Sequence, residues 1–341
     1  MNIIKQNAVY VDSSNGYQTI ERCGRICYKS EESITDGSDI KFCKAMLKNG
    51  HHAMLEHATV YAVVSKPAWQ GICKWIASVK TDEKPDNITP YIRMSNYKRG
   101  CVISLSFRVV VEAVKYFIQS ASNNSSVANF FAQIANAYPE LFNTETLGEE
   151  IQTRLAPLTS KEGMSNICVF YRSTFINYVN ATYEEKDACA IFKKHLTHTI
   201  VFTTNRGVTH ELVRHRPASF AQESTRYCNY SKDKFGNEIT VIEPCFFEKG
   251  SELYTAWKSN CENSEKAYFN MLNKGASAQQ ARGVLVHDVK TDIAITATEA
   301  EWQHILDLRY HGTTGAPHPQ AKELIAIAVP ILRKYTNDRV Q

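Results

Sequence analysis

The most regular pattern of hydrophobic and polar positions lies in the C-terminal third of the chain. Apolar side chains recur every three or four residues over 253–273 and 319–335, as in amphipathic helices. Between them, segment 291–298 is rich in threonine and isoleucine and predicts a strand, and 299–310 predicts a helix directly after it. Ser277 is a suitable N-cap for a shorter helix over 277–284. This third of the chain is therefore expected to mix helices with at least one strand.

Similar patterns occur earlier in the chain, in no fixed order. Strands are predicted over 58–65 and 197–204, where β-branched and aromatic residues dominate. Helices are predicted over 39–48, over 107–137 with a polar break at 120–126, and over 207–213, and a loop is predicted over 81–90. Because strands and helices do not alternate in a repeated order, the predicted fold class is α+β rather than a doubly wound sheet. The glycine-rich loops that bind dinucleotides or triphosphates are absent from the sequence.

Composition and charge exclude several classes of protein. The chain has 341 residues, 43% of them hydrophobic, which is enough for a sizeable core. Lys and Arg exceed Asp and Glu by only 39 − 35 = 4, so neither nucleic acid nor a membrane is an expected partner. No apolar run approaches the about 20 residues of a membrane span, and no signal peptide is recognisable. The ten cysteines form no C-x-x-C pair, so free thiols in a cytoplasmic protein are expected.

The densest concentration of candidate chemistry is segment 214–227, Arg-His-Arg-Pro-Ala-Ser-Phe-Ala-Gln-Glu-Ser-Thr-Arg-Tyr. Its three arginines and one histidine are interleaved with hydroxyl side chains. Guanidinium groups match phosphate oxygens, and serine hydroxyls or loop amides complete such a site. The alternative is a solvated basic loop with local ion pairs to Glu211 and Glu223. Spacing alone leaves both interpretations open.

This segment resembles the signature of the flavin-dependent thymidylate synthases, which is Arg-His-Arg, a serine three positions after the second arginine, and then Ser-x-Arg-Tyr. The preceding residues 206–213 resemble the family's approach helix. Three further matches, in the family's order, are Gly-His-His-Ala-Met-Leu-Glu-His at 50–57, Ala-Arg-Gly-Val-Leu at 281–285, and Trp302-x-x-x-Leu-x-Leu-Arg309. The resemblance covers about 20–66, 197–232 and 265–333, whereas 67–196 match poorly.

The resemblance implies one domain over 1–341, with a small antiparallel sheet flanked by helices and a family-variable, largely helical insertion over 67–196. It also implies reductive methylation of dUMP to dTMP, with FAD, NADPH and methylenetetrahydrofolate as cofactors. A homotetramer whose active sites are built between subunits is expected, and no metal.

The resemblance also implies roles for individual residues. Arg309 is expected to be catalytic, because a fixed guanidinium facing the uracil stabilises negative charge that develops on the ring. The FAD-binding residues are expected to be His51, Ala53, Arg214, His215, Arg216, Gln222, Thr298 and His304. The nucleotide-binding residues are expected to be Glu211, Arg214, Gln222, Glu223, Ser224, Thr225, Arg226 and Arg282, with Ser224, Arg226 and Arg282 at the phosphate.

Several positions depart from the family's pattern. Ala221-Gln222 stands where Asn-Glu is common, and Ala53 replaces a serine or threonine. The family's Asn-x-Arg before the closing helix falls on 298–300, which read Thr-Glu-Ala, and a common glutamine is Glu211. These changes leave the phosphate-binding arginines intact. They reduce the number of expected FAD contacts and leave the choice of pyrimidine open.

Two other functions are therefore compatible with the sequence. One is a related C5 methylase or hydroxymethylase acting on another pyrimidine nucleotide such as dCMP. The other is a single-stranded nucleic-acid binding protein that uses the loop for phosphates and stacking, against which the mild net charge counts. Bound flavin would distinguish the enzymes from the binding protein.

Three residues outside the matched motifs also attract a functional interpretation. Cys245, after Pro244, could be a nucleophile, but a packed thiol beside a turn explains it better, and no cysteine is expected to be essential. His195 and His198 lack a third ligand at matching spacing, so no metal site is predicted there.

Overall fold

The computed structural model describes residues 1–12, 15–78, 92–119, 125–143, 166–181, 186–337 and 339–340. Contacts divide the chain into two compact units. The C-terminal unit comprises Met1–Val11, Cys23–Glu32 and Thr199–Gln341, and the middle unit comprises Asp12–Arg22 and Ser33–His198. The expectation of one domain over 1–341 stays a prediction, and the loop predicted over 81–90 lies outside the described residues. None of the described helices has the length and apolar character needed to cross a membrane.

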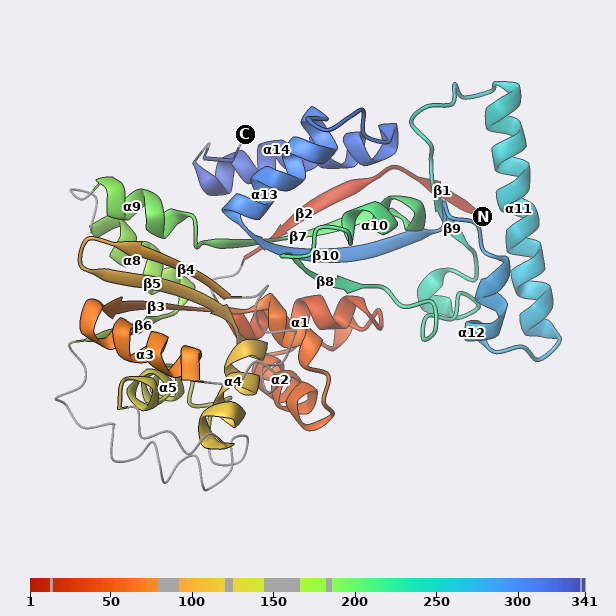
Figure 1. The fold of residues 1–341 in the computed structure, drawn as a ribbon. Helices are drawn as coiled ribbons and strands as arrows, with labels where there is room; N and C mark the ends of the chain where they lie inside the picture. Colours follow the sequence, from red (N-terminus) through yellow and green to blue (C-terminus); the bar gives the residue numbers. More distant parts are fainter. Residues whose placement is uncertain are drawn as a thin grey trace. The chain divides into compact units, whose positions relative to one another are not determined.

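The C-terminal unit contains a four-stranded sheet in the order β2–β7–β10–β8 (Figure 1). Its strands are β2 (Asn7–Val11), β7 (Thr197–Asn205), β8 (Ser219–Gln222) and β10 (Lys290–Thr298). β2 pairs antiparallel with β7, and β8 pairs antiparallel with β10. β7 and β10 confirm the strands predicted over 197–204 and 291–298. A polar loop is the sequence-based expectation from Arg214 onward; β8 corrects it, because the four residues of this strand pair with β10.

Three helices accompany this sheet: α10 (Arg206–Leu212), α13 (Glu299–Leu306) and α14 (Pro319–Thr336). Ile293 and Ile295 alternate along β10 and enter the same core as Trp302 of α13 and Leu324 of α14. α13 and α14 lie together on the sheet (Figure 1). The apolar faces predicted for 299–310 and 319–335 therefore pack into this core. This packing fixes the position of α13 and of the residues that follow Trp302.

The rest of the C-terminal unit is built around α11 (Glu252–Asn273). Ser251 caps this helix by accepting a hydrogen bond from the Tyr254 N–H at 3.1 Å. The helix predicted over 277–284 is divided between α12 (Ala278–Ala281) and a 3₁₀ turn, η8 (Arg282–Val284). β1 (Asn2–Ile4) pairs in parallel with β9 (Thr240–Ile242).

The middle unit contains a second four-stranded sheet, β4–β5–β3–β6, in which every pair is antiparallel. Its strands are β3 (Thr59–Ser65), β4 (Ile92–Tyr97), β5 (Gly100–Ser106) and β6 (Ile167–Phe170). The helices are α2 (Ser38–Lys48), α3 (Lys66–Ser78), α4 (Phe107–Gln119), α5 (Ser125–Ala137), α8 (Arg172–Ala181) and α9 (Lys186–Lys193), and α1 (Gly16–Ile26) begins here and ends in the other unit. The largely helical insertion expected over 67–196 thus also supplies three strands, because β4, β5 and β6 complete a sheet with β3.

The central strand β3 is buried on both faces. Val60, Ala62 and Val64 enter one apolar core, whereas Tyr61 and Val63 enter another. Successive side chains of a strand point to opposite faces, so helices are needed on both sides to cover them. This explains why segment 58–65 reads as an almost continuous apolar run.

His195 lies wholly inside the middle unit. Its Nδ1 is 2.9 Å from the Ser104 hydroxyl and its Nε2 is 2.9 Å from the Ser95 hydroxyl. Both ring nitrogens are therefore occupied by hydroxyl groups rather than available to a metal. Burial, followed by the nearby Arg93 charge, lowers the pKa of His195 from 6.5 to about 3.

This depressed pKa predicts a loss of stability in acid. Below about pH 6.5 the unfolded chain takes up a proton on His195 and the native chain does not, so the free energy of unfolding falls as the pH falls. The contribution is about 1.4 kcal/mol per pH unit, or about 2 kcal/mol between pH 7 and pH 5. Urea unfolding of the full chain and of a His195→Gln variant at both pH values measures it. An equal acid loss in both proteins would show that His195 is not responsible.

Candidate active site

The loop between α10 and β8 carries the Arg-His-Arg sequence. α10 begins at an N-cap, Asn205, whose side chain accepts from the Val208 N–H at 2.8 Å. After this helix the chain turns so that His215 is 4% exposed while Arg214 and Arg216 are exposed. The loop therefore directs the imidazole inward and leaves both guanidinium groups in solvent.

Arg309 lies in a π-helical turn, Asp307–His311, that continues α13. Its Nη1 donates to Glu211 Oε2 at 2.7 Å, its Nη2 donates to the Glu211 carbonyl at 3.0 Å, and its Nε donates to His215 Nε2 at 3.4 Å. A π-helical turn is uncommon and often occurs at functional sites. Glu211 and His215 thus meet around the guanidinium group of Arg309, which comes from a separate sequence motif.

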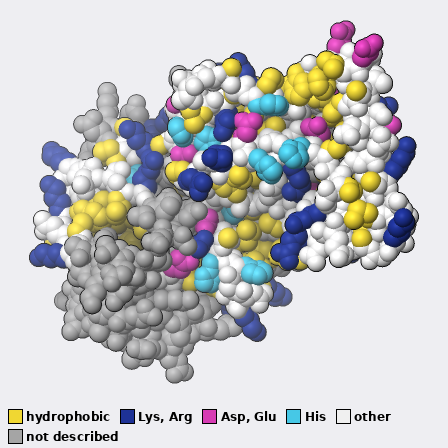
Figure 2. All heavy atoms as spheres, turned by 45° about the vertical axis from the view of Figure 1, so that its right-hand side comes forward, with side chains coloured by type: hydrophobic (Ala, Val, Ile, Leu, Met, Phe, Trp, Pro, Cys, Tyr) yellow, Lys and Arg dark blue, Asp and Glu magenta, His cyan; other side chains and the backbone are white. Residues whose placement is uncertain are grey.

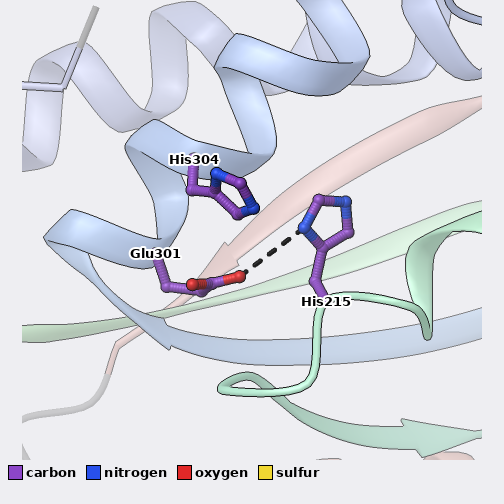
Figure 3. Close-up of side chains that lie close together, drawn as sticks. All are labelled: His215, Glu301 and His304. Atoms are coloured by element: carbon purple, nitrogen blue, oxygen red, sulfur yellow. Dashed lines mark ion pairs between the residues drawn. The ribbon is translucent and has the colours of Figure 1, made fainter. Parts of the chain in front are cut away.

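His215 also faces the beginning of α13, where Figure 3 shows its ring together with Glu301 and His304. Glu301 Oε1 lies 3.5 Å from His215 Nδ1, and the His304 and His215 rings are 5.6 Å apart between centroids. Glu301 is buried, whereas His304 is exposed. His304 is therefore accessible to solvent, and the buried His215 ring lies next to it.

Hydrogen bonds and an ion pair hold the last residue of β8 and the residue that follows it. Gln222 Nε2 donates to the hydroxyls of Thr209 at 3.0 Å and Thr291 at 3.2 Å. Glu223 is 2% exposed and accepts from the Tyr230 hydroxyl at 3.2 Å and from Lys290 Nζ at 3.1 Å. The carboxylate of Glu223 is thus engaged within the protein.

The phosphate-binding candidates form a turn directly after Glu223. The Ser224 N–H donates to the Cys27 carbonyl at 3.0 Å, and Ser224 Oγ accepts from the Arg226 N–H at 3.3 Å. Thr225 is buried beside them, and the exposed Arg226 guanidinium lies 5.6 Å from the centre of the Tyr227 ring. Backbone bonds therefore fix the turn and leave the Arg226 charge in solvent.

Four other predicted site residues lie on other elements of the chain. Arg282 is exposed at the start of η8, and no hydrogen bond or ion pair joins it to Ser224 or Arg226 within the described chain. Thr298 is the N-cap of α13, since its hydroxyl accepts from the Glu301 N–H at 3.3 Å. His51 and Ala53 are exposed in the middle unit, at and just inside the 3₁₀ turn η2 (His52–His57).

The local ion pairs considered for the basic loop are not formed. Glu211 pairs with Arg309 at 2.7 Å, and Glu223 pairs with Lys290 at 3.1 Å. Within the described part of the chain, Arg214, Arg216 and Arg226 have no carboxylate within ion-pair distance. Among the described residues, the three exposed guanidinium groups thus have no counter-ion.

An ion-pair cluster beneath the turn was not expected from the sequence. Asp292 contacts both Lys29 and Lys290, and it accepts from the Thr203 hydroxyl at 2.6 Å. Burial alone would raise the pKa of Asp292, but Lys290 and Lys29 outweigh it and hold the pKa below its ordinary value. The same cluster reaches Glu223 and so supports the turn. Lys29 and Asp292 are 263 positions apart, so no local pattern could have indicated their contact.

Cys245 corrects the expectation of a packed thiol. It lies in a turn, as predicted, but it is exposed. Burial of part of the thiol, followed by Glu323, raises its pKa above the ordinary value, which disfavours the reactive thiolate. All ten cysteines are free thiols.

Comparison with known proteins gives matches over part of the chain. Residues 191–335 match the model of the Thy1 family, described as thymidylate synthase complementing protein. Proteins named flavin-dependent thymidylate synthase are similar to the chain: that of Pyrococcus furiosus is 36% identical over 105 residues, which are 31% of this chain and 42% of the relative. That of Pyrococcus abyssi is 35% identical over the same shares of the two chains.

The chain thus spans less than half the length of these relatives, 42% in each case. A solved structure, the UMP/dUMP methylase PolB from Streptomyces cacaoi bound with 5-Br dUMP, is 17% identical with a TM-score of 0.36, covering 60% of this chain and 85% of that one.

Proposed function

We propose that this chain is a flavin-dependent thymidylate synthase that methylates C5 of dUMP reductively to give dTMP. The observation that carries the proposal is a set of three exposed arginines with no carboxylate within ion-pair distance in the described part of the chain. Arg214 and Arg216 lie in the loop before β8, and Arg226 lies in the turn after it. Uncompensated positive charge of this kind favours bound anions. The description of the family matched by residues 191–335 and the names of the relatives support the reaction.

The residues present fit FAD. Arg214 and Arg216 flank the inward-facing His215 and offer two guanidinium forks to a diphosphate, while the exposed His304 ring offers a surface for a flat ring system. When bound, reduced FAD would supply the hydride and methylenetetrahydrofolate the carbon, with NADPH as the reductant. We further propose a cytoplasmic homotetramer, and the ten free thiols fit a reducing compartment.

The nucleotide would be held at two places. Ser224 and Arg226 offer a hydroxyl and a guanidinium to its phosphate, with Arg282 as a third donor. Arg309 would face the base and stabilise negative charge on the ring oxygens as C5 becomes nucleophilic. Glu211 and Glu223 are already engaged by Arg309 and Lys290, so we assign them to holding the site rather than to direct contact.

Flavin binding tests the proposal. The purified chain is expected to bind FAD, and a variant carrying Arg214→Gln and Arg216→Gln is expected to bind it about tenfold or more weakly, since charged hydrogen bonds are lost. Quenching of FAD fluorescence measures both affinities. Lys258→Gln, on the exposed face of α11, is the matched charge control. Absence of flavin binding together with tight binding of single-stranded DNA would instead support the nucleic-acid function.

A further inference from the structure

Glu301 is a buried carboxylate that the proposed function leaves without a role. It is 8% exposed, and its Oε1 atom makes no hydrogen bond in the described structure although it is enclosed. Its place in α13 suggests a capping box with Thr298, but only the half in which Thr298 accepts from the Glu301 N–H is present. Oε1 instead faces His215 Nδ1 at 3.5 Å (Figure 3). Local helix capping therefore does not account for the carboxylate.

The contact with Arg309 indicates which tautomer a neutral His215 ring adopts. A guanidinium group is always charged and only donates hydrogen bonds. Arg309 Nε donates to His215 Nε2 at 3.4 Å, so Nε2 carries a lone pair. In a neutral imidazole with a free Nε2, the proton resides on Nδ1, which is the atom that faces Glu301. Arg309 Nε is thus a donor facing the acceptor Nε2 of His215, and the protonated Nδ1 of the same ring is a donor facing the acceptor Oε1 of Glu301.

We propose that Glu301 is a positioning residue that selects the Nδ1–H tautomer of His215 and thereby orients Arg309. This inference rests on the proposed function for its kinetic consequence, because Arg309 is the group assigned to the uracil ring. Glu211 holds two nitrogens of the guanidinium group, and His215 holds the third. Only with Nδ1 protonated can the ring accept from Arg309, so a carboxylate at Nδ1 keeps the guanidinium plane fixed.

A metal ion is the alternative for the same three side chains. One ligand atom from each of His215, Glu301 and His304 lies within 4.8 Å of the others, and two histidines with one glutamate form a zinc-type ligand set. An ion on Nδ1 would move the imidazole proton to Nε2, where it would oppose the Arg309 N–H. The observed Arg309–His215 contact therefore favours the tautomer role over a metal site.

Kinetics of two Glu301 variants test the role. Glu301→Leu removes the acceptor and is expected to lower kcat about tenfold, whereas KM for dUMP changes less than about threefold, since the phosphate contacts are untouched. Glu301→Gln keeps an acceptor oxygen and is expected to retain most of kcat. Glu299→Gln is the matched control, because Glu299 is buried on the same turn but pairs with Arg339 at 2.6 Å. It is expected to lose stability without loss of kcat.

A combined variant tests whether Glu301 acts through His215. In a His215→Phe background, Glu301→Leu is expected to cause no further loss of kcat, because the tautomer it selects no longer exists. Independent, multiplicative losses would overturn the proposal. An active wild type with normal kcat in Glu301→Leu would also overturn it while leaving the proposed function intact.

Histidine-labelled protein provides a readout that does not depend on activity. Solid-state ¹⁵N NMR, with the His215 signal assigned by its absence in His215→Phe, is expected to show the proton on Nδ1 in the wild type and redistribution toward Nε2 in Glu301→Leu. A wild-type ring protonated on Nε2 would overturn the proposal. So would Zn²⁺ binding that shifts the His215 and His304 signals together and raises the activity.

Discussion

Replacing Arg309 with alanine is expected to lower kcat for dUMP methylation about 100-fold, which corresponds to about 3 kcal/mol of lost transition-state stabilisation. The guanidinium group is held by the Glu211 carboxylate at 2.7 Å, the Glu211 carbonyl at 3.0 Å and His215 at 3.4 Å. A charge so fixed reorganises little as the ring becomes anionic. Steady-state kinetics with the FAD content of each preparation measured separately would give the value.

Two comparisons make the Arg309 result specific. Arg309→Lys keeps the charge but loses the planar fork that reaches Glu211 twice, so it is also expected to be impaired. Arg226→Ala is expected to raise KM for dUMP more than it lowers kcat, since Arg226 is exposed on the turn assigned to the phosphate. A near-normal kcat in Arg309→Ala would remove this residue from catalysis.

Replacing Trp302 with alanine is expected to lower the free energy of unfolding by about 4 kcal/mol. The Trp302 side chain is 0% exposed and packs with Phe202, Ile293 and Leu324 in the core beneath α13. Removing the indole leaves a cavity that neighbouring side chains fill only in part. Urea unfolding followed by circular dichroism measures the loss.

The control for Trp302 is an exposed apolar residue in the same unit. Leu253 is 65% exposed at the start of α11, so Leu253→Ala is expected to change the free energy of unfolding by less than about 0.5 kcal/mol. A similar small change in Trp302→Ala would contradict the packing described for α13.

Elements with a strong local pattern could be predicted from the sequence. α11, α14 and β10 follow from the spacing of their apolar residues and lie within two residues of the expected limits. β8 could not be predicted, because Ser-Phe-Ala-Gln has no strand pattern of its own and becomes a strand by pairing with β10. The middle unit's β4 and β6 are likewise defined by their partners.

In the candidate site, the sequence predicts individual residues but not the contacts among them. The motifs identified Arg309, His215 and Glu211 separately, but the contacts among them join positions more than ninety residues apart and need the fold. For Glu301 the sequence offers only a helix-capping pattern. Its approach to His215 could not be predicted, because it depends on how α13 packs. The ion pairs of Lys29 and Asp292 depend in the same way on strand placement.

The most direct test of the central claim is turnover by the purified chain. FAD, NADPH and methylenetetrahydrofolate would be supplied with dUMP, and with dCMP in a parallel reaction, and the nucleotide products identified by mass. The proposed function predicts conversion of dUMP to dTMP, with the mass of one methylene group gained, and no product from dCMP. Conversion of dCMP instead, or no product from either nucleotide with FAD bound, would contradict it.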